Sequence, residues 1–394
     1  MKICFICPEY PPTPHGGMGT FIHIITRALA RAGHEVRVVG VYNHTDASPG
    51  VQEDEGVRIW RLKSRKRHLE WIVDRHAQYR MIRGWVAAGE IDLVEAPDFA
   101  GWFAGWPRVP VPLVQRAHGS ATYFAHELGR QVTTVSNRLE KWSYRRADAW
   151  VAVSEHAARV TQRVLDLPRG ADAVLYYPVD APAQVPSFEE RDPDRVVFTG
   201  TLTVKKGIVS IIDAWPAIKE GHPTARLEVY GKDQRRSDGT SMRDYLIGRL
   251  PDALRGSVEF HGHVTRQRLM QALQGARAAV FPSFTETFGL GPAEAVGCGC
   301  PTIYTKLSCG PEVVRDGVDG LLVDPQRPDE IAAAVLALLS DGGRAAALAA
   351  TGRRRVLEEF ALDRIVRKNE EFFERTVRDF HRSAAAVSRA YAID

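Results

Sequence analysis

The chain has 394 residues and a formal net charge of +4, and its residues are 44% hydrophobic and 25% charged. This length predicts two domains of ordinary size, and the composition is typical of a soluble globular protein. The mild net charge gives no reason to expect a nucleic-acid partner. Because no run of about 18 apolar residues occurs, no membrane-spanning helix is expected, and we expect a cytoplasmic protein.

Cysteine usage indicates a reducing compartment, because five cysteines are too few and too scattered for a disulfide framework. Cys4 and Cys7 form a C-x-x-C within the apolar stretch "KICFICP". We interpret them as buried core thiols rather than as a zinc or redox site. The first residues lead directly into a proline loop without a small-residue cleavage site, so no signal peptide is expected.

Strand and helix patterns alternate along the first half of the chain. Apolar stretches bounded by turn residues predict strands, and apolar residues at helical spacing predict helices. The expected strands are 2–7, 34–42, 57–63, 91–97, 111–118 and 148–154, and the expected helices are 20–33, 68–88, 138–147 and 155–165. Such alternation is typical of a parallel sheet with helices on both faces.

Residues 178–194 interrupt this alternation, because they contain four prolines, several charges and no apolar periodicity. The pattern resumes after them, which predicts an α/β protein with two Rossmann-like domains. The expected domains are 1–180 and 195–374, with a linker at 181–194 and a helix at about 375–394 that packs back on the first domain. Two such domains would face each other across a cleft, with ligands beyond the carboxyl ends of the strands.

Two glycine-rich loops each follow a predicted strand and precede a predicted helix. The loop "HGGMG" contains Gly16 and Gly17, whose backbone N–H groups could approach an anion, although a plain turn is the alternative. The loop "FTGTLTVKKG" places Lys205 and Lys206 at a helix start, where a lysine could hold a diphosphate or remain a solvated charge. Neither loop is a G-x-G-x-x-G or a P-loop motif.

The stretch "SFTETFGLGPAEAVGCGCPTI" carries the strongest signal. Gly289, Leu290 and Gly291 are expected to open a helix whose free backbone amides form an anion site. Glu286 lies on the loop before this helix, where its carboxylate could accept hydrogen bonds from sugar hydroxyls. Glu294, about one turn into the helix, could accept from the vicinal hydroxyls of a ribose, or be placed there by the helix dipole. Two carboxylates around an anion site suit a nucleotide-sugar.

Several segments, in this order, resemble the retaining glycosyltransferases of the two-Rossmann GT-B fold, glycosyltransferase family 4. They are "GGMGTFIHIITRALARAGHEVRVVG", "VAVSEHAARV", "FTGTLTVKKGIVSIIDAW", "FHGHVTRQRLMQALQGARAAVFPSFTETFGLGPAEAVGCGCPTI" and "EVVRDGVDGLLVDP". The resemblance covers almost the whole chain, and the fourth segment is similar to the E-x7-E region of the family.

The resemblance implies roles for the residues that match. Glu286 is similar to the glutamate that binds hydroxyls of the transferred sugar near the reacting centre, and Glu294 to the one that binds the donor ribose. Lys206 resembles the phosphate-binding lysine. His118, after a strand of the first half, resembles the histidine that touches the donor sugar, although a satisfied structural histidine is the alternative.

Backbone groups complete the donor site that the resemblance implies. The amide of Gly17, with Gly16 before it, resembles the one that meets the diphosphate, and Val264 lies where the family's backbone contacts the base. The amides expected at the sugar and phosphate are those of Phe288, Gly289 and Leu290.

The chain departs from the family pattern at the diphosphate. The family usually has a glycine–arginine pair before the lysine, whereas Gly200 is followed here by Thr201. One cationic phosphate ligand is therefore missing unless Lys205 substitutes for it. The sequence "LYYPVD" also replaces an asparagine–glycine turn before the linker, which concerns hinge geometry only.

We expect no cofactor and no metal. Backbone amides, a lysine and a helix dipole would stabilise the negative charge that develops on a leaving diphosphate. The D-x-D of metal-dependent sugar transferases occurs only as Asp192 to Asp194, in the predicted linker, where we interpret it as solvated charge. Retention of configuration is implied by the resemblance alone, and no protein nucleophile is nominated.

The expected acceptor is a sugar, a lipid-linked sugar or a small aglycone. Aromatic residues after first-half strands could stack on it or pack in the core. They are Trp102, Phe103, Trp106, Tyr123 and Phe124. The basic, amphipathic segment 61–83 could rest on the inner face of an anionic membrane or be a solvated helix face. Its cations are Arg61, Lys63, Arg65, Lys66, Arg67, Arg75, Arg80 and Arg83.

We therefore expect an enzyme, a hexosyltransferase that uses a nucleoside-diphosphate sugar in the biosynthesis of a glycan, a glycolipid or a glycosylated metabolite. One alternative is an isomerase or phosphorylase on the same scaffold, which usually brings extra acid–base groups or a cofactor lysine. The other is a non-catalytic protein that binds the nucleotide-sugar.

Overall fold

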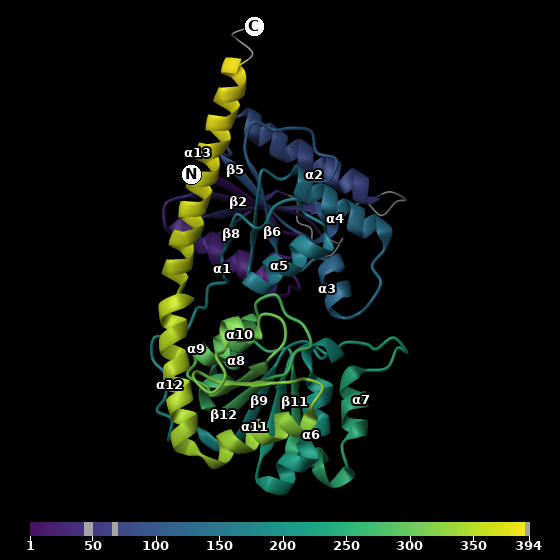
Figure 1. Cartoon of the computed structure of the whole chain (residues 1–394), viewed down its shortest axis with the longest axis vertical. Coiled ribbons are helices and arrows are strands. Elements are labelled where there is room, and N and C mark those ends of the chain that lie inside the picture. The colour runs from purple at the N-terminus through teal and green to yellow at the C-terminus, as the bar shows by residue number, and fades with distance from the viewer. Residues whose placement is uncertain (43–49, 65–69, 391–394) are drawn as a thin grey trace. The chain divides into compact units, whose positions relative to one another are not determined.

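The structure, a computed structural model, describes residues 1–42, 50–64 and 70–390 (Figure 1). The chain divides into two compact units. Unit 1 comprises Met1–Pro178 together with the chain from Leu362 onward, and unit 2 comprises Val179–Ala361. Each unit is built on one sheet with helices packed against it.

The sheet of unit 1 has eight strands in the order β3-β4-β2-β1-β5-β6-β7-β8. All neighbouring strands are parallel except β3 and β4, which are antiparallel. The bounds are β1 Lys2–Ile6, β2 Glu35–Tyr42, β3 Val51–Asp54, β4 Val57–Lys63, β5 Leu93–Pro97, β6 Leu113–Ala117, β7 Ala149–Ala152 and β8 Ala173–Val174. The loops after the parallel strands therefore reach the same edge of the sheet.

The helices of unit 1 follow the predicted alternation. They are α1 Gly17–Arg31, α2 Glu70–Ala87, η1 Phe99–Gly101, α3 Ala121–Glu127, α4 Thr134–Arg146, α5 Glu155–Val164 and α13 Leu362–Ala390. Cys4 and Cys7 are free and fully buried, which confirms the prediction of core thiols. Burial raises the pKa of the Cys4 thiol to about 12, so it stays protonated.

The sheet of unit 2 has six parallel strands in the order β11-β10-β9-β12-β13-β14. Their bounds are β9 Asp192–Thr199, β10 Arg226–Tyr230, β11 Val258–Gly262, β12 Ala276–Phe281, β13 Thr302–Thr305 and β14 Leu321–Val323. The helices are η2 Val204–Lys206, α6 Ile208–Gly221, α7 Met242–Arg249, η3 Asp252–Ser257, α8 Arg266–Gly275, α9 Leu290–Gly297, α10 Gly310–Val313, α11 Pro328–Ser340 and α12 Gly342–Glu359. One apolar core, which includes Trp215, Leu227 and Val280, lies between sheet and helices.

The return of the chain to unit 1 begins earlier than the sequence predicted. The whole of α13 from Leu362 belongs to unit 1, whereas the sequence placed the boundary near residue 375. Residues 362–390 contain no glycine or proline that would break the helix, so a domain boundary within it is not expected. Phe373 is fully buried, with its ring 6.2 Å from that of Phe5. Asn369 is also buried and accepts a hydrogen bond from Arg116 at 2.7 Å.

The placement of Asp192 and Asp194 in a linker was wrong, although both carboxylates stay partly exposed, as expected of solvated charges. Both belong to β9, and each carboxylate has partners. Asp192 forms an ion pair with Arg226, and Asp194 lies 2.7 Å from Nε2 of His222. Proline is tolerated at the start of a strand, so Pro193 does not end the strand as the composition implied.

No single helix in the described ranges is long and apolar enough to cross a membrane. Taken together, helices α11 and α12 have the length and composition of a membrane span, but the two helices meet at an angle of 100°.

We predict that Phe373→Ala destabilises unit 1 by about 3 to 5 kcal/mol, because it removes a fully buried ring from a packed core. Urea denaturation followed by circular dichroism should show an earlier unfolding transition. Glu374→Ala, at the exposed neighbouring position, is the matched control and should leave the transition in place. Equal transitions for both variants would contradict the assignment of this helix to the core of unit 1.

Candidate functional site

The strongest sequence signal folds as predicted, into a loop and a helix start. Helix α9 begins at Leu290 and has Gly289 as its N-cap, with Pro292 in the first turn. Gly289 has a φ of +84°, and a Cβ there would lie 2.0 Å from the hydroxyl oxygen of Tyr304. Only glycine fits this conformation and this space. The backbone of Leu290 and Gly291 therefore presents N–H groups that have no acceptor within the helix.

Glu286 lies on this loop and is paired with a lysine. Its Oε1 is 2.5 Å from Nζ of Lys206 and accepts a hydrogen bond from Oγ of Ser283 at 3.0 Å. Glu286 is 8% exposed, so its carboxylate lies largely out of water, while the side chain of Lys206 is 29% exposed. The sequence predicted both residues at one anion site, and the structure brings them into direct contact.

Two main-chain features hold Lys206 against this loop. The N–H of Phe284 donates to the carbonyl oxygen of Lys205 at 2.8 Å, which ties the loop after β12 to the loop after β9. Gly207 follows with a φ of +73°, and a Cβ there would lie 1.8 Å from the carbonyl oxygen of Pro282. The close approach of the two loops thus depends on glycine at position 207.

Glu294 is buried on α9 and is paired with an arginine that the sequence analysis missed. It is the fifth residue of the helix, beyond the first turn, so the helix dipole does not explain its place. Its carboxylate forms an ion pair with Arg266, the first residue of α8. Burial raises the pKa of Glu294, and the charge of Arg266 opposes that shift.

The remaining predicted donor residues of unit 2 lie on loops at the same edge of the sheet. Thr201 and Lys205 follow β9, and Val264 lies between β11 and α8, directly before Thr265, which caps α8. Thr201 is exposed, and Lys205 and Val264 are partly buried. Phe288 is fully buried, with its ring 5.4 Å from that of Phe360, so its side chain is part of the core.

The predicted residues of unit 1 lie at the start of α1 and after β6. Gly16 is the N-cap of α1, and Gly17 is its first residue. A Cβ at Gly17 would meet no atom within 4 Å, whereas one at Gly19 would lie 2.4 Å from the carbonyl oxygen of Glu9. Packing in the described part of the chain therefore requires glycine at 19, and it leaves position 17 open.

Glu9 is a further residue that the sequence analysis missed. Its Oε1 accepts a hydrogen bond from the N–H of Gly19 at 2.7 Å, so a carboxylate of the protein already lies at the N-terminus of α1. Burial raises the pKa of Glu9 from its usual range. An anionic ligand at this helix end would share the backbone amides with that carboxylate.

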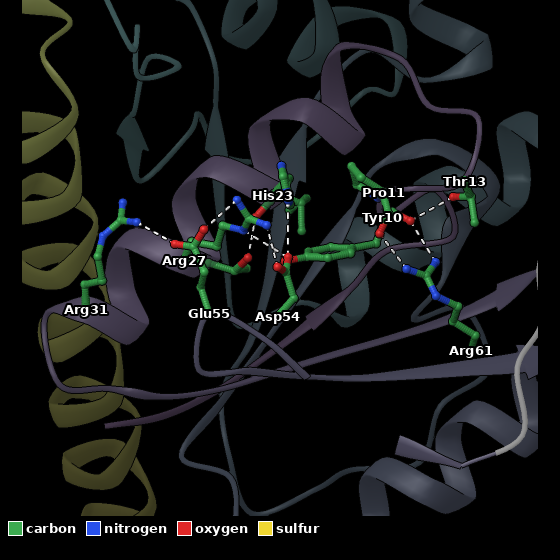
Figure 2. A network of polar contacts seen from close by, with 11 residues as sticks. Tyr10, Pro11, Thr13, His23, Arg27, Arg31, Asp54, Glu55 and Arg61 are labelled. Atoms are coloured by element: carbon green, nitrogen blue, oxygen red, sulfur yellow. Dashed lines mark hydrogen bonds and ion pairs between the residues drawn. The ribbon is translucent and has the colours of Figure 1, made fainter. Parts of the chain in front are cut away.

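Figure 2 shows how Arg61 holds the loop that leads to these glycines. Its guanidinium donates to the carbonyl oxygens of Tyr10 at 2.7 Å and of Pro11 at 2.6 Å, and to the side chain of Gln52 at 2.8 Å. The guanidinium carbon also lies 4.9 Å from the ring centre of Tyr42. Arg61 is therefore buried and holds the loop through hydrogen bonds, so it cannot be one of the cations that were considered for contact with a membrane.

Asp54, the last residue of β3, is the second anchor of this loop (Figure 2). It accepts from the hydroxyl of Tyr10 at 2.8 Å and from Nε of Arg27 at 2.9 Å, and Nε2 of His23 lies 3.2 Å away. Although burial alone would raise it, the hydrogen bonds from Arg27 and Tyr10 hold the pKa of Asp54 below its usual value. Together, Arg61 and Asp54 fix the first loop from two sides.

His118 lies directly after β6 and is 7% exposed. Asp98 accepts from the backbone N–H of His118 at 2.9 Å, and Nδ1 of the imidazole lies 2.5 Å from the hydroxyl of Tyr177. Its ring also packs 5.4 Å from that of Phe21 on α1. Burial, and then the charge of Arg116, holds the pKa of His118 well below its usual range. The imidazole is therefore neutral at neutral pH.

The aromatic residues considered for the acceptor belong mainly to the core. Trp102, Phe103 and Trp106 pack together under the sheet of unit 1, and Tyr123 is fully buried. The stacking role was therefore wrong for these four, whereas Phe124 is partly exposed.

The cations of the basic segment 61–83 differ in their exposure. Arg75 is buried and donates to the carbonyl oxygen of Gly101 at 3.3 Å, while Arg80 and Arg83 are exposed on α2. Lys63 is exposed at the end of β4. Arg65, Lys66 and Arg67 lie outside the described residues.

The described ranges contain no group of three or more His, Cys, Asp or Glu side chains that could hold a metal ion.

Comparison with known proteins gives one family description for each half of the chain. Residues 15–181 match the family described as Glycosyltransferase Family 4, and residues 193–341 match Glycosyl transferases group 1. The glycogen synthase of Mycobacterium tuberculosis is 29% identical over 392 residues, which cover 91% of each chain. The D-inositol 3-phosphate glycosyltransferase of Xylanimonas cellulosilytica is 29% identical over 382 residues, covering 88% of this chain and 89% of that relative.

Two solved structures are similar over nearly the whole chain. Sucrose-phosphate synthase from Thermosynechococcus elongatus superposes with a TM-score of 0.77 at 21% identity, covering 95% of this chain and 98% of that one. Anabaena HepE in complex with UDP and glucose gives a TM-score of 0.71 at 17% identity, with 95% and 99% covered. At these identities the likeness concerns the fold.

We predict that Arg61→Ala loosens the first loop, because the carbonyl oxygens of Tyr10 and Pro11 lose their buried donor. Each unpaired buried acceptor costs about 1 to 3 kcal/mol. The thermal midpoint should fall, and limited proteolysis should cut between residues 9 and 16. Arg58→Ala on the same strand is the control, since the side chain of Arg58 is 42% exposed and pairs at the surface with Glu35. Equal resistance of both variants to proteolysis would contradict the role of Arg61 in holding the loop.

Proposed function

The chain belongs to the glycosyltransferases of family 4 and group 1, and from this membership we propose that it transfers a hexosyl unit from a nucleoside-diphosphate sugar to an acceptor hydroxyl, with retention of configuration. The protein is a glycosyltransferase, and its α/β fold is the GT-B fold expected from the sequence. The donor class, the retention and the independence of metal are our proposals.

The observation that carries the proposal is the pairing of Glu286 with Lys206 beside the start of α9. A lysine and the amides of a helix N-terminus bind phosphate oxygens, while a carboxylate accepts hydrogen bonds from sugar hydroxyls. A molecule with a sugar joined to a diphosphate offers both groups at adjacent positions. Anabaena HepE, similar in fold, was solved with UDP and glucose, which supports this donor class.

We propose that Lys206 and the amides at Leu290 and Gly291 stabilise the leaving diphosphate. Breaking the bond to the sugar places negative charge on the leaving oxygens, and fixed donors lower the energy of that charge without rearranging. Lys206 would exchange Glu286 for a phosphate oxygen, and Glu286 would then accept hydrogen bonds from the sugar. This division of charge requires neither a metal nor a cofactor. The roles expected for Gly17, His118 and Thr201 stay predictions.

For the acceptor we propose a polyhydroxylated molecule, either a sugar, free or lipid-linked, or a small aglycone. The similar proteins include a glycogen synthase and a D-inositol 3-phosphate glycosyltransferase. The molecules in their names, glycogen and inositol 3-phosphate, both carry several hydroxyl groups. Contact with the inner face of a membrane stays a prediction. Ile72 and Val73, which are exposed on the same helix as Arg80 and Arg83, α2, are the residues that would make it.

The test of the function is incubation with a panel of UDP-, ADP- and GDP-hexoses, with glucose, inositol and their phosphates as acceptors. We expect release of nucleoside diphosphate with one donor, and a new glycoside by mass spectrometry. Binding of a donor without release, in the presence of every acceptor, would favour the non-catalytic alternative. Epimerised or phosphorolysed sugar would favour the isomerase or phosphorylase.

Metal independence has its own prediction. Activity should persist in excess chelator, because Lys206 and backbone amides supply the stabilisation of the leaving group. The assay compares rates with chelator alone and with added magnesium or manganese. A rate that is lost with chelator and restored by either ion would refute the proposal.

The two glutamates should differ in their kinetic effects. Glu286→Gln should mainly lower kcat, because contacts to the sugar tighten in the transition state. Glu294→Gln should mainly weaken binding of nucleoside diphosphate, through the ribose. Each lost charge-assisted hydrogen bond is worth about 1.5 to 3 kcal/mol, so each effect should be about tenfold or more. Unchanged nucleotide affinity in Glu294→Gln, measured by calorimetry, would refute its assignment.

A further inference from the structure

Arg266 lies at a helix position that is electrostatically unfavourable for a cation. It is the first residue of α8, where the partial positive charge of the helix end repels a guanidinium. The cap of this helix is the preceding residue, Thr265, whose hydroxyl accepts from the N–H of Arg268 at 3.3 Å. Arg266 therefore contributes nothing to starting the helix, and its side chain has partners elsewhere.

The guanidinium of Arg266 reaches from the surface to a buried carboxylate. It forms an ion pair with Oε1 of Glu294 on α9, and Nη2 donates to the carbonyl oxygen of Asp180 at 3.3 Å. The same guanidinium lies 3.9 Å from Oδ2 of Asp180. The side chain of Arg266 is 39% exposed, whereas that of Glu294 is 7% exposed. Arg266 is thus held at two points, and its charge is directed to Glu294.

The other charged and titratable groups near Glu294 do not replace this cation. The carboxylate of Asp180 raises the pKa of Glu294, as burial does, and only Arg266 acts in the opposite direction among the groups that shift it. Cys298 directly follows α9, and burial raises the pKa of its thiol to about 12, so it carries no charge at neutral pH. Among the groups that shift the pKa of Glu294, Arg266 is therefore the one that favours the carboxylate form.

We propose that Arg266 is a positioning residue of the donor site: its guanidinium keeps Glu294 as an oriented anion, ready to accept hydrogen bonds from the two hydroxyls of a ribose. The inference rests on the proposed function, because it takes the ribose of a nucleoside diphosphate as the ligand of Glu294. A neutral carboxyl group would accept these bonds more weakly. Arg266 itself need not touch the ligand.

The experiment measures the affinity of UDP, ADP and GDP by calorimetry between pH 6 and pH 8.5, for the natural protein and for Arg266→Gln and Arg266→Lys. The nucleotide that binds most tightly is then compared with its 2′-deoxy counterpart. We expect Arg266→Gln to bind the ribonucleotide about tenfold more weakly near pH 6. This loss of affinity should become smaller as the pH rises. Removing the cation raises the pKa of Glu294 further, so Glu294 becomes a carboxylate again only at a pH above that raised pKa.

Three comparisons separate this role from a structural one. The 2′-deoxy nucleotide should bind the natural protein and Arg266→Gln with similar affinity, and Arg266→Lys should restore most of the preference for ribose. Arg268→Gln, at an exposed position on the same helix, is the matched control and should behave as the natural protein. Thermal midpoints without nucleotide should show that all variants are folded.

The results distinguish the inference from the proposed function. If the natural protein binds none of the nucleotides, the proposed function fails. If it binds one with a preference for ribose and Arg266→Gln keeps that affinity and preference at every pH, the inference about Arg266 is overturned and the function stands. Equal weakening of ribose and 2′-deoxy nucleotides at every pH would likewise overturn it, since that result marks a structural role.

Discussion

Both units depend on one physical constraint: a carboxylate removed from water must be given a cation or several hydrogen-bond donors. In unit 1, Glu95 is almost fully buried on β5 and receives two hydrogen bonds of 2.8 Å from Arg116 on the neighbouring strand. In unit 2, Glu286 is met by Lys206. The first pair is fully buried, while the second lies on the loops that follow β9 and β12, where under the proposed function a ligand takes over one partner. The same pairing of a carboxylate with a cation thus belongs to the core of unit 1 and to the proposed donor site of unit 2.

Two glycines allow the close approach of the chain segments that form the proposed donor site of unit 2. Gly207 and Gly289 both have positive φ, and at each the neighbouring chain lies closer than a Cβ allows. Gly207 lets the loop after β9 lie against the loop after β12, so that Lys206 from one meets Glu286 from the other, whereas Gly289 lets the start of α9 lie against Tyr304 of β13. A parallel sheet supplies the rest, because its strands all end at the same edge.

The sequence was sufficient for the parts of the site that are local. Glycines at a helix start, a proline in the first turn and a glutamate on each side of the turn are neighbours along the chain, so their spacing predicts their arrangement. Arg266 was not predictable in this way, because 28 positions separate it from Glu294 and only the packing of α8 against α9 makes them partners. Glu9 was missed for a similar reason, since its carboxylate turns back to the N–H of Gly19.

Arg61 shows the opposite error, a residue that was noticed and misinterpreted. It lies among other cations in a segment that reads as a basic surface, and the alternation of β4 cannot show that the loop from Tyr10 to Pro11 covers it. The boundary of α13 was misplaced because the sequence of a helix does not state which unit it packs on. The fold class followed from periodicity, whereas these contacts follow from tertiary packing.

The membership of α13 in unit 1 has a consequence for how the protein is made. Unit 1 is discontinuous in sequence, since its core takes Phe373 and its buried Arg116 takes Asn369 from the last part of the chain. Unit 2 is continuous and complete once Ala361 has been synthesised. During translation the N-terminal part must therefore wait, with one side of its apolar core uncovered, while the later unit is finished. The usual order, in which the N-terminal domain folds before the next one, is therefore not open to unit 1 as a whole, because part of its core is synthesised last.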